Sequence, residues 1–130
     1  MKPLALLGLA CLVAVSCGQP TLHGTLTLTS SSGVSHSGTS CQGTAGYDDL
    51  TQGAPVTVKN ENGSIIATSS LDAGVADSTY PTVVCHFSFT VENLPDAKFY
   101  AIEISHRGEV TYSKDQLSGN GWKADATIGD

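Results

Sequence analysis

The chain contains few charged and few aromatic side chains. Charged residues make up 14% and aromatic residues 6% of its 130 residues. Its six lysines and arginines, set against twelve acidic residues, form no basic run, and this argues against binding to nucleic acid. A carbohydrate site built on several aromatic platforms is also disfavoured, because the tyrosines available for exposure are Tyr47, Tyr80 and Tyr112.

Long hydrophobic runs and catalytic motifs are missing as well. The main apolar stretch, residues 4–15, holds about 12 residues and is too short to span a bilayer. The chain has no Gly-x-Ser-x-Gly elbow, no Ser-x-x-Lys and no glycine-rich phosphate loop. We therefore expect no enzymatic activity and no cofactor.

The first 16 residues have the layout of a secretory signal peptide. One cation, Lys2, precedes the apolar stretch, and small residues surround Ser16 and Cys17. Cys17-Gly18-Gln19-Pro20 would break a helix at once, which argues against a buried core helix here. We expect residues 1–16 to be removed and the mature chain to begin at Cys17.

The end of this leader resembles a known motif. Ala14-Val15-Ser16-Cys17 is similar to the lipobox of bacterial lipoproteins, and the resemblance implies a diacylglycerol thioether on Cys17. Cys11 leaves with the leader, so a lipidated Cys17 would leave an even number of cysteines. Residues 17–20 would then be the tether of a lipid-anchored domain over residues 21–130. An ordinary secretory cleavage, which would give a secreted protein, is the alternative.

The two remaining cysteines, Cys41 and Cys85, are expected to form a disulfide. Export places the chain in an oxidising compartment, where disulfides persist. The bond would close a loop of about 45 residues. A zinc site is poorly supported, because the two cysteines are not a Cys-x-x-Cys pair and no second pair exists.

Downstream of the tether the hydrophobic pattern has the period of β-strands. Alternation is clear at Thr25–Thr29 and at Cys85–Val91, and Asn62-Gly63 has the form of a hairpin turn. Residues 30–47 and 72–81 are expected to be loops, and Ser113 with Gln116 predicts one helical turn over residues 113–118. The pattern predicts an all-β fold: a single antiparallel β-sandwich of about seven strands, over residues 25–29, 55–59, 64–71, 85–91, 99–105, 110–112 and 122–128.

Residues 54–58, 63–67 and 87–102 resemble the prealbumin-like, or transthyretin-like, β-sandwich of bacterial surface repeats. That family combines a strand, an Asn-Leu-Pro turn and a strand that opens with Tyr. Residues 105–108 and 121–122 look like those of small actinobacterial envelope lipoproteins without an assigned function. The resemblance implies a fold and supplies no catalytic residues.

Metal-ligating side chains show no diagnostic spacing. The four histidines, His23, His36, His86 and His106, form no His-x-His or His-x-x-x-His pair. His86 and His106, together with Asp48 and Asp49, are the weak candidates for a site assembled across strands. Adjacent aspartates lack the alternate spacing of a calcium loop, and turn capping explains them better.

These patterns predict a binding or structural module of the cell envelope, held by lipid on the extracytoplasmic face of the membrane. Its expected partners are the membrane, through Cys17, and an envelope protein or small ligand. An exported carrier of a ligand or metal, using the surface histidines, is the first alternative. A small envelope hydrolase is the second.

Overall fold

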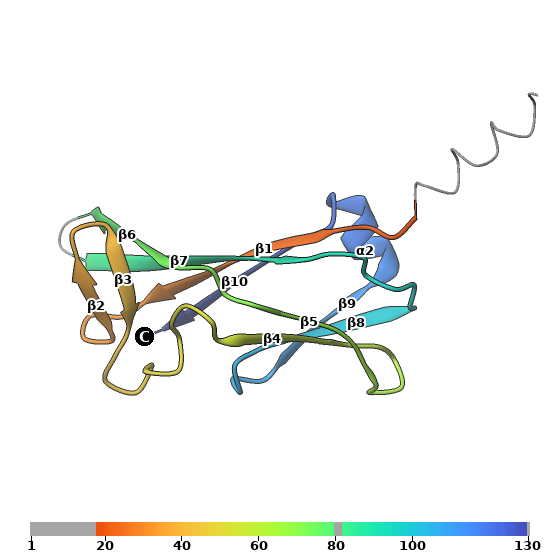
Figure 1. Cartoon of the computed structure of the whole chain (residues 1–130), viewed down its shortest axis with the longest axis horizontal. Helices are drawn as coiled ribbons and strands as arrows, with labels where there is room; N and C mark the ends of the chain where they lie inside the picture. Colours follow the sequence, from red (N-terminus) through yellow and green to blue (C-terminus); the bar gives the residue numbers. More distant parts are fainter. Residues whose placement is uncertain (1–17, 80–81, 130) are drawn as a thin grey trace, which may run out of the picture.

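The computed structural model describes residues 18–79 and 82–129, which form two β-sheets and one short helix (Figure 1). The predictions for the leader, Cys17 and Tyr80 lie outside the described residues. The elements are β1 (Leu22–Thr29), β2 (Val34–Ser37), β3 (Ser40–Gly43), β4 (Pro55–Lys59), β5 (Ile65–Ser70), β6 (Gly74–Thr79), β7 (Thr82–Val91), β8 (Phe99–Ile104), β9 (Glu109–Ser113), α2 (Lys114–Gly119) and β10 (Lys123–Gly129).

The two sheets stack as a sandwich. The larger sheet has the strand order β10-β1-β7-β6-β3-β2, and the smaller one has the order β5-β4-β8-β9. In Figure 1 they form the upper and lower layers, with α2 beside one end. The all-β prediction is confirmed, although the described residues form ten strands instead of about seven.

Alternating side chains from both sheets share one core. On β7, Cys85, Phe87, Phe89 and Val91 are buried and Ser88 is exposed, as the alternation predicts. Each large apolar side chain buried in this way contributes about 1.5–3 kcal/mol. The smaller sheet supplies the opposite wall through Val56, Val58, Tyr100, Ile102 and Ile104.

Both expected long loops contain strands. Residues 30–47 hold the β2–β3 hairpin, and residues 72–81 hold β6, which pairs with β7 from Val75↔His86 onward. Serine, threonine and glycine dominate these segments, so they lack the apolar alternation that identifies a strand. They pair at the margin of the larger sheet, where few side chains need to enter the core.

The expectation of a purely antiparallel sandwich is wrong at one pair. β10 runs parallel to β1, in a register from His23↔Lys123 to Thr29↔Gly129. The chain leaves α2 beside the start of β1, where the His23 N–H donates to the Trp122 carbonyl (2.9 Å). The last strand therefore enters the sheet at that end and must run in the same direction as β1.

The predicted helical turn is present as α2. Ser113 accepts a hydrogen bond from the Gln116 N–H, and the Gln116 side chain accepts one from the Ser113 N–H. This reciprocal pair is the capping box that the sequence indicates. It fixes where β9 stops and α2 begins.

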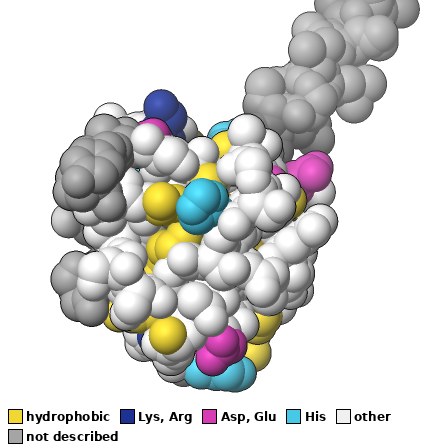
Figure 2. Space-filling view, turned by 90° about the vertical axis from the view of Figure 1, so that its left-hand side faces the viewer, with side chains coloured by type: hydrophobic (Ala, Val, Ile, Leu, Met, Phe, Trp, Pro, Cys, Tyr) yellow, Lys and Arg dark blue, Asp and Glu magenta, His cyan; other side chains and the backbone are white. Residues whose placement is uncertain are grey.

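The sandwich has two distinct ends. Residues 18–21, 60–64, 92–98 and 114–122 meet at the α2 end, where Pro20 accepts from the Leu94 N–H and Lys98 accepts from the Lys114 N–H. The opposite, hairpin end carries β2, β3, the adjoining ends of β6 and β7, and the turn after β8 (Figure 1). Figure 2 looks onto the hairpin end, whose surface is mostly uncharged, with scattered hydrophobic and histidine side chains.

Candidate functional site

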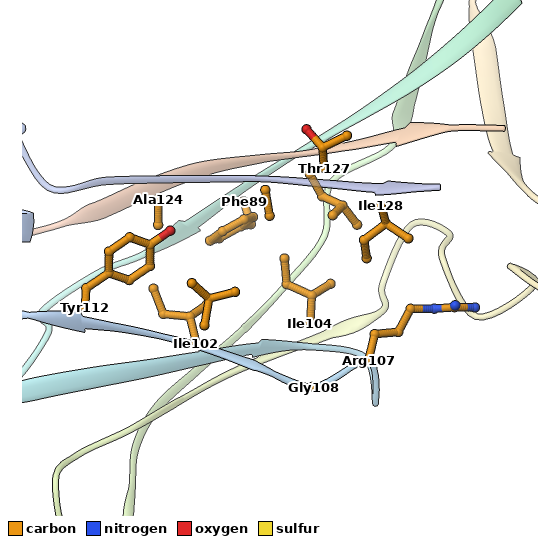
Figure 3. A pocket seen from close by; sticks show the side chains of 12 residues that line it. Phe89, Ile102, Ile104, Arg107, Gly108, Tyr112, Ala124, Thr127 and Ile128 are labelled. Atoms are coloured by element: carbon orange, nitrogen blue, oxygen red, sulfur yellow. The ribbon is translucent and has the colours of Figure 1, made fainter. Parts of the chain in front are cut away.

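An apolar groove opens between β9 and β10, the edge strands of the two sheets on the same side of the sandwich (Figure 3). Its volume is about 200 Å³. An enclosed apolar cavity of about 150 Å³ holds a benzene molecule, so the groove has room for a bulky apolar group. The main lining residues are Leu26, Phe89, Ile102, Ile104, Val110, Tyr112, Ala124, Ala126 and Ile128.

The groove exists because the facing edge strands carry too little side-chain volume to close it. Val110 on β9 lies opposite Ile102 of β8 and so points toward the other sheet, yet it is 50% exposed. β10 turns Ala124, Ala126 and Ile128 toward the groove, and two of these three side chains are single methyl groups. The gap between the layers therefore stays open to solvent along this side.

The Tyr112 hydroxyl is the polar group inside the groove. Figure 3 shows its ring directed across the groove toward Phe89 and Ala124. It makes no hydrogen bond with any residue that the structure describes. A hydroxyl in an apolar setting favours a ligand that brings a donor or acceptor to it.

Arg107 borders the groove, but its charge is used elsewhere. Its guanidinium points away from the groove (Figure 3). It donates to both carboxylate oxygens of Asp49 and to the Gly46 carbonyl (2.6 Å), and it lies 4.8 Å from the centre of the Tyr47 ring. The cation thus joins the turn after β8 to residues 46–49, and the groove is left to a neutral ligand.

The same contact defines the role of Asp49. The hydrogen bonds from Arg107 lower the pKa of the Asp49 carboxyl from 3.8 to about 2, and one from Ser105 assists. Asp49 is therefore the partner of Arg107 in an ion pair. This role differs from both turn capping and metal binding, the two roles considered from the sequence. Its sequence neighbour Asp48 is exposed.

Replacing Asp49 with asparagine should flatten the acid dependence of stability. The carboxyl pKa is 3.8 in the unfolded chain and about 2 in the fold, so its stabilising effect is complete above about pH 4 and is lost toward about pH 2. The Asp49 side chain is 38% exposed, and screening keeps the effect below about 1 kcal/mol. Urea unfolding of the wild type and Asp49→Asn at pH 7 and pH 2 measures it.

The exposed neighbour provides the control for this ion pair. Asp48→Asn should leave the stability at pH 7 unchanged. Equal losses in the two variants would show that the Asp49–Arg107 contact does not stabilise the fold.

The structure does not gather the candidate metal ligands. His86 lies on β7 of the larger sheet, with its Nδ1 3.0 Å from Thr27 Oγ1 and its Nε2 4.0 Å from Asp77 Oδ2. His106 is exposed in the turn after β8 of the smaller sheet. Within residues 18–79 and 82–129, no group of three or more His, Cys, Asp or Glu could hold a metal ion.

The predicted disulfide is present. Cys41 on β3 and Cys85 on β7 are bonded, with a Cα–Cα distance of 5.9 Å, and both are buried. Gly74 of β6 lies against them, since a Cβ there would stand 2.7 Å from Cys85 Sγ. The bond ties the β2–β3 hairpin to the centre of the larger sheet.

Comparisons with protein-family models, curated proteins and solved structures give no match. The prealbumin-like and lipoprotein resemblances of the sequence therefore stay predictions. In the described part of the chain, no helix is long and apolar enough to cross a membrane.

Proposed function

We propose that the chain is an exported, lipid-anchored envelope protein whose sandwich binds an extended segment of a partner protein in the groove between β9 and β10. The leader and the lipobox-like Cys17 support the anchor. The buried Cys41–Cys85 bond supports an oxidising compartment. No catalytic step belongs to the proposal.

The observation that carries the binding function is the position of the groove between two edge strands. No strand in the described chain pairs with the outer edge of β9 or of β10. Each edge offers backbone N–H and C=O groups to an added strand. A partner strand with alternating apolar side chains could pair with β10 and place every second side chain in the groove, with Tyr112 beside its backbone.

A small apolar molecule with one polar group is the second candidate ligand. The Tyr112 hydroxyl, directed into a space of about 200 Å³, favours it. Such a ligand would make the protein an exported carrier. This carrier would bind its ligand in the groove and not through the surface histidines.

Intact-mass spectrometry of protein purified from its native membrane tests the anchor. We expect the mass of residues 17–130 plus an acylated glyceride, and a gain of about 2 Da on reduction as the Cys41–Cys85 bond opens. An unmodified mass would remove the anchor from the proposal. A mass without a reduction shift would remove the oxidised state.

A pair of variants on neighbouring residues of β10 tests the groove. Ala126 points inward, whereas Thr127 borders the groove but directs its side chain away from it (Figure 3). Ala126→Phe therefore fills the groove, while Thr127→Phe adds the same ring on the outer face of β10. The probe is a blocked synthetic peptide of alternating valine and threonine, added to the mature chain carrying Cys17→Ser. We expect peptide-induced amide shifts on β9 and β10 in the wild type and in Thr127→Phe, and their loss in Ala126→Phe.

Two other results would contradict strand addition. Equal shifts in both variants would place the peptide elsewhere. No peptide-induced shift in the wild type, together with binding of an apolar dye that Ala126→Phe abolishes, would instead favour the small-molecule carrier.

A further inference from the structure

The fixed part of the chain begins very close to the proposed lipid. The Pro20 carbonyl accepts a hydrogen bond from the Leu94 N–H (2.9 Å), so the domain holds the chain from Pro20 onward. Cys17 is three residues earlier, a span of at most about 10 Å. The glyceride of a lipoprotein lies at the boundary of the hydrocarbon core, below a headgroup layer several ångströms thick. The short span between Cys17 and Pro20 therefore keeps the α2 end at the bilayer surface.

We propose that the α2 end docks on the membrane surface, with Trp122 seated at the interface. This inference rests on the proposed anchoring through Cys17. It adds an orientation: the α2 end faces the bilayer, and the hairpin end faces away from it.

Trp122 has the chemistry and position of an interface residue. It is half-buried and stands edge-on to Tyr100, with 5.8 Å between ring centres. Indole rings favour the membrane–water interface, where one part of the ring is apolar and the other wet. A hollow of about 450 Å³ joins Trp122 to the start of the tether and is lined by Gly18, Gln19, Pro20, Leu94, Asp96, Tyr100, Lys114 and Trp122.

The backbone holds Trp122 in an unusual conformation. Its φ is +61°, a left-handed value that is costly for a bulky side chain. Two hydrogen bonds impose it: the Trp122 N–H donates to Leu117 (2.7 Å), and the Trp122 carbonyl accepts from His23 (2.9 Å). The ring is thus presented at the α2 end by a rigid support, which suits a fixed contact with a surface.

The distribution of cations agrees with this orientation. Lys98, Lys114 and Lys123 lie at the α2 end, and Lys98 and Lys123 form no ion pair with the described residues. Lysine stems can lie along a membrane surface while their ammonium groups reach phosphate oxygens. Four acidic residues share this end, so it is close to neutral and suits a zwitterionic surface: Glu61, Glu92, Asp96 and Asp115.

The other two cations of the mature chain are held in ion pairs. Lys59 pairs with Glu109 (2.7 Å), and Arg107 pairs with Asp49. With the α2 end on the bilayer, β9 and β10 extend between the surface and the hairpin end, β9 running toward the surface and β10 away from it (Figure 1). The groove then opens sideways and stays accessible to a partner.

Trp122 is the single tryptophan of the chain, so its fluorescence reports the docking directly. Cys41 and Cys85 are bonded, which leaves Cys17 as the free thiol of the mature chain. We would couple this thiol to a maleimide phospholipid and insert the conjugate into phosphatidylcholine vesicles. One vesicle set carries a nitroxide on the headgroup and another carries it near the end of the acyl chain. We expect strong quenching of Trp122 by the headgroup nitroxide, weaker quenching from the acyl chain, and a blue shift of its emission.

A distal tryptophan provides the control. Val75 on β6 is 56% exposed at the hairpin end, and the Trp122→Phe/Val75→Trp conjugate should float with the vesicles without quenching. Equal quenching of both conjugates, or none in either, would overturn the docking. The conjugate is anchored chemically, so this result is independent of whether the cell lipidates Cys17, which intact mass decides.

Discussion

Replacing Cys41 and Cys85 together with alanine is expected to lower the free energy of unfolding by about 4 kcal/mol. The bond spans a sequence separation of 44 residues, so its loss gives the unfolded chain a large gain in conformational freedom. A domain of this size has a total stability of about 5–15 kcal/mol, so the double variant should be marginal. Urea unfolding at pH 7, followed by circular dichroism, measures the change.

The reduced wild-type protein separates the two parts of this effect. Reduction removes the crosslink and keeps both sulfur atoms, whereas the double alanine variant also removes buried atoms, since Cys85 is fully buried. We expect reduction to account for most of the loss. A urea midpoint that does not move on reduction would show that the pairing of β2, β3 and β6 is stable without the bond.

The sequence is most informative where side chains alternate strongly or a turn needs particular residues. β7 was predictable because its apolar residues fall on one face. The α2 cap was predictable because Ser113 and Gln116 interact within one turn. In both cases the information is local, within a few residues of the chain.

The sequence is least informative where the structure depends on distant pairing. β2 and β3 carry almost no apolar side chains, and their pairing with β6 at the sheet margin gives them their form. The Arg107–Asp49 contact joins residues 58 positions apart. The groove is a deficit of volume between β9 and β10, and no single residue indicates it. The small residues Ala124 and Ala126 can be read from the sequence, but the sequence does not show that β9 faces them.

The proposed anchor, binding groove and membrane-facing end are compatible with one orientation of the domain. In the proposed anchoring a short tether would fix the α2 end, and the parallel entry of β10 beside β1 brings Trp122 next to residues 18–20. The same β10 then forms one wall of the groove. The strand that orients the domain on the bilayer would therefore also position the site that meets a partner.

The second large effect is expected from Gly24→Ala, next to the groove residues Phe89 and Ala124. Gly24 lies in the middle of β1, paired with Phe89 on one side and Ala124 on the other. A Cβ at this position would stand 2.1 Å from Phe89 Cζ and 2.4 Å from the Ala124 carbonyl oxygen. Adding a methyl group to a packed core usually costs about 1–3 kcal/mol, and we expect the upper part of this range because one contact is backbone. Urea unfolding measures the loss.

Gly119→Ala is the matched control, because a Cβ there meets nothing within 4 Å. Alanine in place of an unconstrained glycine stabilises a fold by about 0.4–1 kcal/mol, so the two substitutions should have opposite signs. A Gly24→Ala protein as stable as the wild type would mean that Phe89 can move aside freely.

Phe89 connects this packing to binding. If the new methyl group displaces its ring into the groove, Gly24→Ala should weaken the peptide-induced shifts on β9 and β10 as well as the fold. Adding Phe89→Leu shortens the side chain that the methyl group meets, and the double variant should then recover part of both losses. A positive coupling of this kind is expected only for residues in contact. If the double variant recovered stability but not the peptide-induced shifts, the ligand would not touch the part of the groove that Phe89 forms.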